Sequence, residues 1–63
     1  MTLRDFLYKG RQRLTLIKLI DNDQNITLAE DYLKKIIEFH PEYLDNEVYG
    51  WEIDDNHSIT LWI

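Results

Sequence analysis

The chain has 63 residues, of which 44% are apolar or aromatic, and it carries a formal net charge of −5. A disordered chain would be poorer in apolar residues, so the composition predicts one small folded domain over residues 1–63. There is no cysteine, which excludes disulfides and thiolate metal sites, and no apolar run reaches the roughly 20 residues of a membrane helix.

The first residues predict a short helix. Thr2 and Asp5 have the spacing of a capping box, in which each side chain binds the backbone N–H of the other residue. Leu3, Phe6 and Leu7 would share one face of this helix, and a glycine at position 10 suits its C-terminal end. We therefore expect a helix over about residues 3–9.

Residues 11–20 are apolar on both faces, which is typical of a central strand. The Asx-rich residues 21–25 that follow favour a turn. Their Asp-x-Asp-x-Asn spacing matches only the first ligand positions of a calcium loop. Ile26 stands where that loop needs glycine, and Tyr32 stands where it needs a bidentate glutamate. The segment is therefore interpreted as a polar turn without a metal.

A second capping-box pattern occupies residues 27–30 and precedes an amphipathic stripe, which predicts a longer helix. The stripe comprises Leu28, Ala29, Tyr32, Leu33, Ile36 and Ile37. Glu30 and Asp31 would pair with the lysines four residues later. The helix should weaken at His40, because a residue before proline avoids the α region. An alternative is that residues 26 and 27 belong to a short second strand.

The C-terminal part predicts a helical turn followed by a β-hairpin. Residues 41–45 begin with a proline, as short helical turns often do. Two period-2 runs, 49–54 and 58–63, flank an Asx-rich turn, which is a strong hairpin signal. The element order predicts an α+β fold: a three- to four-stranded antiparallel or mixed sheet, with a short N-terminal helix and one longer helix on one face. The expected core comprises Leu3, Phe6, Leu7, Leu14, Leu16, Leu33, Ile36, Ile37, Tyr49, Trp51, Ile53, Ile59, Leu61 and Ile63.

The hairpin also offers a candidate binding surface. If the odd-numbered residues face inward, a second set faces outward together: Val48, Gly50, Thr60 and Trp62. An exposed tryptophan within a rim of acids resembles the apolar anchors of protein interfaces. The candidate partner-binding residues are Val48, Trp62, Glu47, Glu52, Asp54 and Asp55. Two alternatives remain open: the N-terminal segment covers Trp62, or the register is shifted by one residue.

The uneven distribution of charge along the chain indicates which classes of partner to expect. Residues 1–20 hold five bases against one acid, whereas residues 21–63 hold eleven acids against two bases. The acidic part would repel phosphate, so we expect no direct nucleic-acid binding, and a basic protein is the complementary partner. The competing interpretation is that the acids only keep a small protein soluble.

Patterns for catalysis or metal binding are weak. His40 and His57, without any cysteine, are a poor basis for zinc. The single serine, Ser58, supports no catalytic triad, and Glu52 and Asp54 on an exposed strand lack a pocket that would shift their pKa values. No glycine-rich phosphate loop is present. We therefore expect no enzymatic activity, no metal and no cofactor.

The C-terminal third resembles a set of very short acidic proteins encoded by phages and prophages of low-GC Gram-positive bacteria. The shared segments are residues 41–48, which begin with Pro-Glu-Tyr-Leu-Asp, and residues 51–56 and 59–63 of the predicted hairpin. The resemblance implies a non-enzymatic mobile-element accessory protein, located in the cytoplasm of a bacterial host, that binds and inhibits or modulates a basic host protein. Some small proteins of this type are anti-CRISPR inhibitors of nucleic-acid-handling defence proteins. The alternative is a self-associating structural or regulatory module, a homodimer through the outward sheet face, and neither reading involves a membrane.

Overall fold

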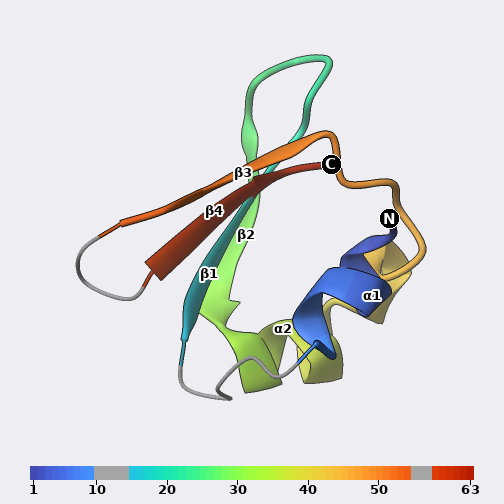
Figure 1. Cartoon of the computed structure of the whole chain (residues 1–63), viewed down its shortest axis with the longest axis vertical. Coiled ribbons are helices and arrows are strands. Elements are labelled where there is room, and N and C mark those ends of the chain that lie inside the picture. Colours follow the sequence, from blue (N-terminus) through green and yellow to red (C-terminus); the bar gives the residue numbers. More distant parts are fainter. Residues whose placement is uncertain (10–14, 55–57) are drawn as a thin grey trace.

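The computed structural model describes residues 1–9, 15–54 and 58–63. It is an α+β fold with a four-stranded mixed sheet and two short helices (Figure 1), as the sequence predicts. The elements are α1 (Leu3–Leu7), β1 (Leu16–Ile20), β2 (Thr27–Tyr32), α2 (Leu33–Phe39), a 3-10 turn η1 (Pro41–Tyr43), β3 (Gly50–Ile53) and β4 (Ser58–Trp62).

The strands lie in the order β2-β1-β4-β3. β1 is antiparallel to β2 and parallel to β4, while β3 and β4 form the predicted antiparallel C-terminal hairpin. The prediction that the first strand is central is therefore confirmed, because β1 has a partner on each side. The two ends of the sheet are β2 and β3.

The predicted capping box begins α1. The Thr2 hydroxyl accepts from the Asp5 backbone N–H at 3.2 Å, and the Asp5 carboxylate accepts from the Thr2 backbone N–H at 3.3 Å. The hydrogen bond from the Thr2 backbone N–H, followed by that from its side chain, lowers the pKa of the Asp5 carboxyl. The helix ends at Leu7, two residues earlier than expected, and the predicted terminating glycine at position 10 lies outside the described residues.

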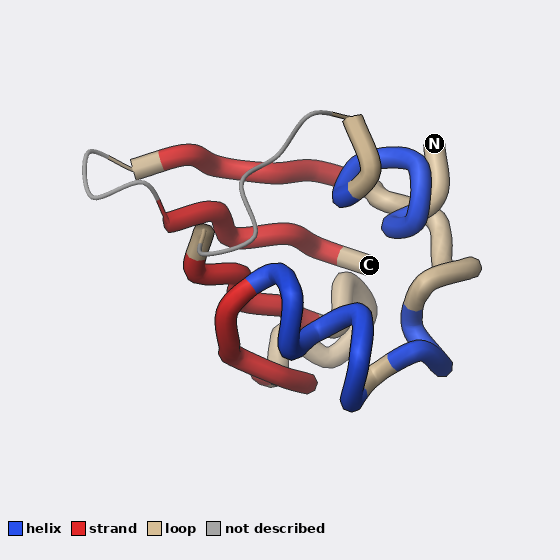
Figure 2. Tube along the Cα trace, turned by 90° about the horizontal axis from the view of Figure 1, so that it is seen from below, coloured by secondary structure: helices blue, strands red, loops and turns tan. Residues whose placement is uncertain are grey.

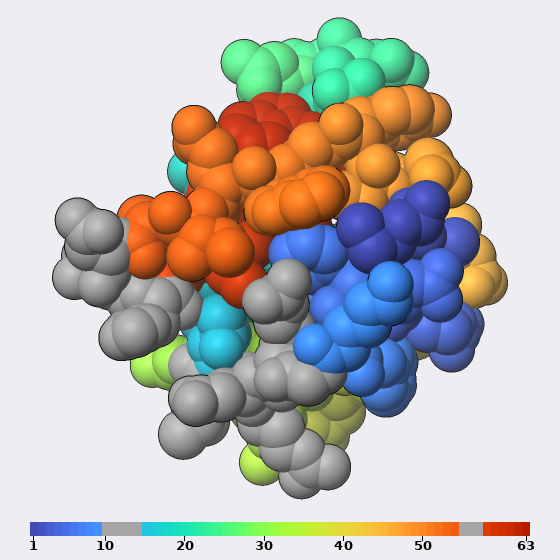
Figure 3. Space-filling model, in the orientation of Figure 1, coloured from blue at the N-terminus to red at the C-terminus, as the bar shows by residue number. Residues whose placement is uncertain are grey.

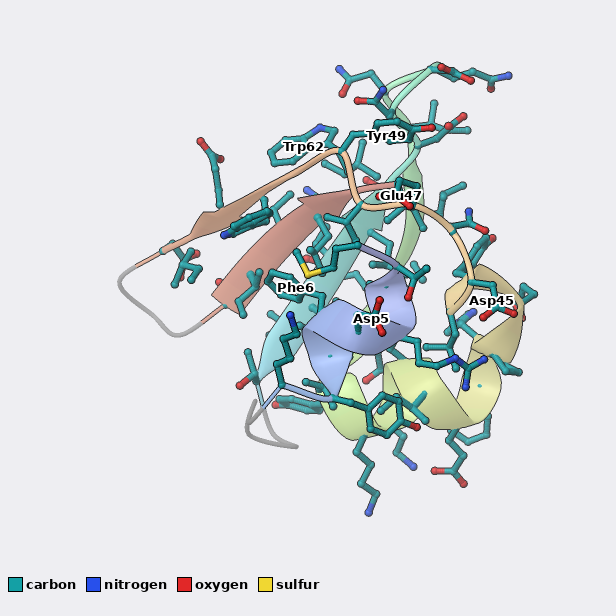
Figure 4. All side chains as sticks on the ribbon, turned by 45° about the vertical axis from the view of Figure 1, so that its right-hand side comes forward. Asp5, Phe6, Asp45, Glu47, Tyr49 and Trp62 are labelled. Carbon is teal, nitrogen blue, oxygen red and sulfur yellow. The ribbon has the colours of Figure 1, made fainter. Side chains whose placement is uncertain are left out.

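The N-terminal segment is fastened to residues 44–48. The Leu3 and Arg4 N–H groups donate to the carbonyls of Asn46 and Leu44 at 2.9 and 2.8 Å. These are helix N-terminal donors that have no partner within the helix. The Arg4 guanidinium also lies 3.1 Å from the Asp45 carboxylate. Figure 4 shows α1 beside the segment that carries Asp45 and Glu47.

The predicted start of the second helix is wrong. Residues 27–32 form β2, and the helix begins only at Leu33. Ala29 lies opposite Leu19 in the ladder, and both side chains are buried. Pairing with β1 thus outweighs the local capping-box pattern, since tertiary contacts override weak helix propensity. The alternative of a second strand was right, but that strand takes six residues.

The charge pairs expected at helical spacing are lost with this change. Glu30 lies opposite Lys18 across the β1–β2 ladder rather than one helical turn from Lys34. The other end of α2 is as predicted: the helix stops at Phe39, and Pro41 begins the 3-10 turn after it.

The core lies between the two helices and one face of the sheet (Figure 2). It comprises Leu3, Phe6, Leu7, Ile17, Leu19, Ala29, Leu33, Ile36, Leu44, Ile59, Leu61 and Ile63. The expectation for β1 was shifted by one residue, because Ile17 and Leu19 are buried while Leu16 is exposed. Ile37 is partly buried against the core, and Leu14 lies outside the described residues.

β3 departs most from the expected core. Trp51 lies opposite Leu61 and Ile53 lies opposite Ile59, so the predicted facing of the hairpin is confirmed. Trp51 and Ile53 are nevertheless exposed, and so is Tyr49 just before them. α2 packs against β2 and β1, near the edge of the sheet opposite to β3. The helical layer is therefore narrower than the four strands, and it leaves β3 largely uncovered.

Candidate protein-interaction surface

The predicted anchor, Trp62, lies on the face of the sheet that points away from the helices. It pairs with Gly50 on one side and Ile20 on the other, and it is half-buried. Gly50 adds no side chain there, and a Cβ at this position would meet nothing within 4 Å. Neither helix packs on this open face, so α1, the described helix of the N-terminal segment, does not cover Trp62.

Val48 lies elsewhere than predicted. It is partly buried and packs against the core, and its N–H donates to the Met1 carbonyl at 2.8 Å. The expected outward group is therefore reduced to Gly50, Thr60 and Trp62, which the ladder places on the open face. Val48 also holds the N-terminal segment through this hydrogen bond.

The predicted acids have different surroundings. Glu47 forms an ion pair with the N-terminal ammonium group. The Asp54 carboxylate accepts from both the backbone N–H and the hydroxyl of Ser58, the first at 3.1 Å. Glu52 is exposed and lies opposite Thr60 on the open face. Asp55 lies outside the described residues.

The surface that the sequence did not identify is formed by Tyr49, Trp51 and Ile53, here called the β3 patch. Their exposed fractions are 67%, 49% and 58%. The Trp51 ring packs on Phe6 of α1, with 5.4 Å between ring centroids and 56° between planes. In Figure 3, side chains of the 49–53 segment meet those of α1 on one continuous face. Large apolar side chains gathered on one exposed strand are typical of interaction sites.

A signal for the β3 patch exists in the sequence, although it is indirect. The helix predicted over about residues 3–9 is only about 10 Å long, so it covers a small part of a sheet of four strands that lie about 4.8 Å apart. Some strand at an edge must then leave its inward-facing residues exposed. The sequence does not say which strand is at the edge, because strand order depends on contacts between distant segments.

The chain segment that carries the β3 patch is acidic. The stretch from residue 41 to residue 63 contains no lysine or arginine and six acids: Glu42, Asp45, Glu47, Glu52, Asp54 and Asp55. Of the described acids, Glu47 and Asp54 flank β3 in the chain and Glu52 lies within it. An exposed apolar strand whose own segment carries charges of one sign has the layout of an interface that selects an oppositely charged partner.

The open face carries a shallow hollow of about 220 Å³. It is lined by Leu16, Lys18, Glu30, Asp54, Ser58, Ile59 and Thr60. A second hollow, of about 380 Å³, lies on α1 beside Arg4, Asp5, Tyr8 and Lys9. Both mix charges of opposite sign at the surface.

Over the residues described, no three histidine, aspartate or glutamate side chains lie close enough to hold a metal ion together. His40 Nδ1 lies 3.6 Å from a Glu42 carboxylate oxygen, and its ring stacks on Tyr43. His57 is outside the described residues. The predicted turn at 21–25 is present between β1 and β2, where an Asp21 carboxylate oxygen accepts from the Asp23 N–H at 3.2 Å.

In the described ranges, neither helix is long and apolar enough to cross a membrane. No family model, no curated protein and no solved structure matches this chain.

Proposed function

We propose that the protein acts by stoichiometric binding to a basic surface of another protein, with the β3 patch as the contact. The observation that carries this proposal is the exposure of Tyr49, Trp51 and Ile53. They lie in a stretch, residues 41–63, that contains six acids and no lysine or arginine. Aromatic residues supply most binding energy at interfaces, and neighbouring charges select the partner and speed its approach.

The finer proposal is that the partner is a nucleic-acid-handling host protein that this chain inhibits. Such a partner has a basic channel or groove for phosphates, and an acidic protein that occupies it would exclude nucleic acid. The resemblance to short phage and prophage proteins supports this direction, and it makes an anti-CRISPR-like inhibitor the sharpest form of the proposal. No catalytic step is part of it.

A second candidate function is self-association through the open face. Leu16 and Tyr32 lie opposite each other there, and both are exposed. Together with Trp62 they give this face apolar side chains that neither helix covers. A homodimer would bury them, although two chains of net charge −5 repel each other.

Photo-crosslinking tests the proposal. Benzoylphenylalanine replaces Tyr49 in one variant and Phe39, an equally accessible aromatic on α2, in the matched control. Irradiation in a low-GC Gram-positive lysate should yield a covalent product with a basic protein from position 49 and not from position 39. The yield should fall as salt rises. Equal products from both positions, or an acidic captured protein, would contradict a specific contact at β3.

A further variant with the crosslinker at Tyr32 tests the second candidate. A product of twice the chain's own mass from position 32, and none from position 49, would favour self-association through the open face.

A further inference from the structure

We propose that the partner adds an extended segment to β3 as a fifth strand, with apolar and basic side chains in alternation. This inference rests on the proposed function, and it names the kind of segment that the β3 patch accepts.

Among the described residues, no strand pairs with the side of β3 that faces away from β4. Asp54 N–H donates to the Ser58 carbonyl at 3.0 Å, which makes those two residues a hydrogen-bonded pair. Hydrogen-bonded and non-hydrogen-bonded pairs alternate along an antiparallel ladder. Trp51 and Ile53 therefore turn their backbone N–H and C=O groups away from β4. β3 is the last strand of the sheet, so these groups face the edge.

The opposite edge of the sheet is different. Leu33 N–H donates to the Thr15 carbonyl at 2.8 Å, so alternation turns the N–H of Tyr32 outward from β2. That N–H already donates to the side chain of Asp31 at 2.8 Å. A side chain that occupies an outward N–H is one of the ways in which proteins protect an edge strand. On β3 the corresponding donors are bordered by exposed apolar side chains instead.

The N-terminal segment limits where a new strand could lie. Thr2 bridges to Glu47, and the Val48 N–H donates to the Met1 carbonyl. The chain just before β3 is therefore occupied, and the open stretch begins at β3 itself. An added strand would pair with Trp51 and Ile53, the two residues whose backbone faces the edge.

The side chains of β3 define the chemistry of the added strand. Residues directly opposite each other in neighbouring strands have their side chains on the same face. Those opposite Trp51 and Ile53 would lie on the apolar face, and the one between them would lie beside Glu52. An apolar–basic–apolar segment fits both faces. A second copy of β3 would place another Glu52 carboxylate at this edge, so charge favours the basic segment.

The test uses one peptide and two backbone-methylated forms of it. The probe is acetyl-Lys-Val-Lys-Val-Lys-Val-Lys-amide. One form carries N-methyl groups on the three valine amides, and the other carries them on the amides of the three lysines that follow a valine, so both keep the charge and the number of methyl groups. An antiparallel added strand bonds β3 through the valine amides. Methylation there should weaken binding at least about tenfold, while lysine methylation should change it little.

The protein side of the test is Ile53→Pro, with Ile53→Ala as its control. Proline removes an N–H that faces the edge and is tolerated on an edge strand, whereas alanine removes the side chain and keeps the N–H. Both variants lose the exposed side chain of Ile53 and should bind the peptide more weakly than the parent, but the proline variant should lose clearly more binding, because it alone also lacks the N–H. In the parent protein, NMR should show slower hydrogen exchange at the Trp51 and Ile53 amides when the peptide is added. Far-UV circular dichroism of both variants confirms that the fold persists.

The outcomes separate the two proposals. If both methylated peptides bind as the parent does and the Trp51 and Ile53 amides stay unprotected, strand addition is wrong, while salt-sensitive binding would still support a basic partner. If no peptide binds although position 49 crosslinks to a basic protein, strand addition alone fails. If the two amides are already protected in a dimer without peptide, a second copy occupies the edge and the proposal is overturned.

Discussion

Trp51 and Leu61 lie directly opposite each other on the same face of the β3–β4 hairpin, yet Leu61 is fully buried and Trp51 is 49% exposed. The two residues have the same position in the alternation of their strands, so the local pattern does not explain the difference in exposure. The difference comes from the helical layer, in which α2 packs over β2 and β1, at the opposite edge of the sheet from β3. The Phe6 ring packs against Trp51 but leaves half of it exposed, so one strand of a regular hairpin belongs to the core and the other to the surface.

The first prediction compares the same substitution on the two strands. Leu61→Asp should unfold the protein, because an unpaired buried charge costs several kcal/mol against a total stability of about 5 kcal/mol. Ile53→Asp should keep a cooperative unfolding transition close to that of the parent, since the side chain of Ile53 is exposed. Urea unfolding followed by circular dichroism measures both, and similar losses for the two variants would contradict the described coverage.

Trp62 gives a second prediction. Its side chain is half-buried on the open face, so Trp62→Ser should lower the free energy of unfolding by about 1 kcal/mol. Truncation of a core aromatic residue costs about 3–5 kcal/mol, and a loss of that size would place Trp62 in the core. Analytical ultracentrifugation of the parent and the variant shows whether the parent forms a dimer and whether the substitution dissociates it.

A third prediction separates two neighbouring acids by their contacts. The Asp54 carboxylate holds Ser58 across the hairpin, so Asp54→Ala should destabilise the fold by about 1 kcal/mol. Glu52→Gln should leave stability unchanged, because an exposed charge contributes little to it. With a basic partner, Glu52→Gln should slow association and flatten its salt dependence, which stopped-flow mixing at several salt concentrations measures. An unchanged association rate would mean that Glu52 has no role in steering the partner.

The fourth prediction concerns pH. The hydrogen bond from the Thr2 backbone N–H lowers the pKa of the Asp5 carboxyl in the folded protein. A lowered folded pKa means that the ionised carboxylate stabilises the fold. This contribution is present above the ordinary pKa of about 4 and is lost as the pH falls through the lowered folded value. The free energy of unfolding of the parent should therefore exceed that of Asp5→Asn at neutral pH, and the difference should shrink as the pH falls toward 2. Urea unfolding at several pH values measures it.

NMR titration of the Asp5 carboxyl carbon checks the cause of that shift. In Thr2→Val the backbone N–H remains, while the hydroxyl is lost, so the pKa should rise only part of the way to its ordinary value. A full return would assign the shift to the hydroxyl instead.

The sequence by itself determined the elements whose cause is local. The capping box at Thr2 and Asp5 starts α1 because its partners are three residues apart. His40 ends α2 because the next residue is a proline, and the C-terminal hairpin forms where two alternating runs meet at an Asx-rich turn. The facing of β3 and β4 followed from the same alternation, and it is correct in the structure.

Only the tertiary structure decided the features that depend on distant contacts. Residues 27–32 have the pattern of a helix start, but they pair with β1 instead. The ladder that buries Ala29 beside Leu19 stabilises the fold more than a capped first turn would. The candidate surface changed for the same reason. Alternation fixes which way Tyr49, Trp51 and Ile53 point, whereas their exposure depends on the strand order and on the width of the helical layer above them. Neither quantity is encoded in the period of a single strand, because burial requires a second element to be present at that place.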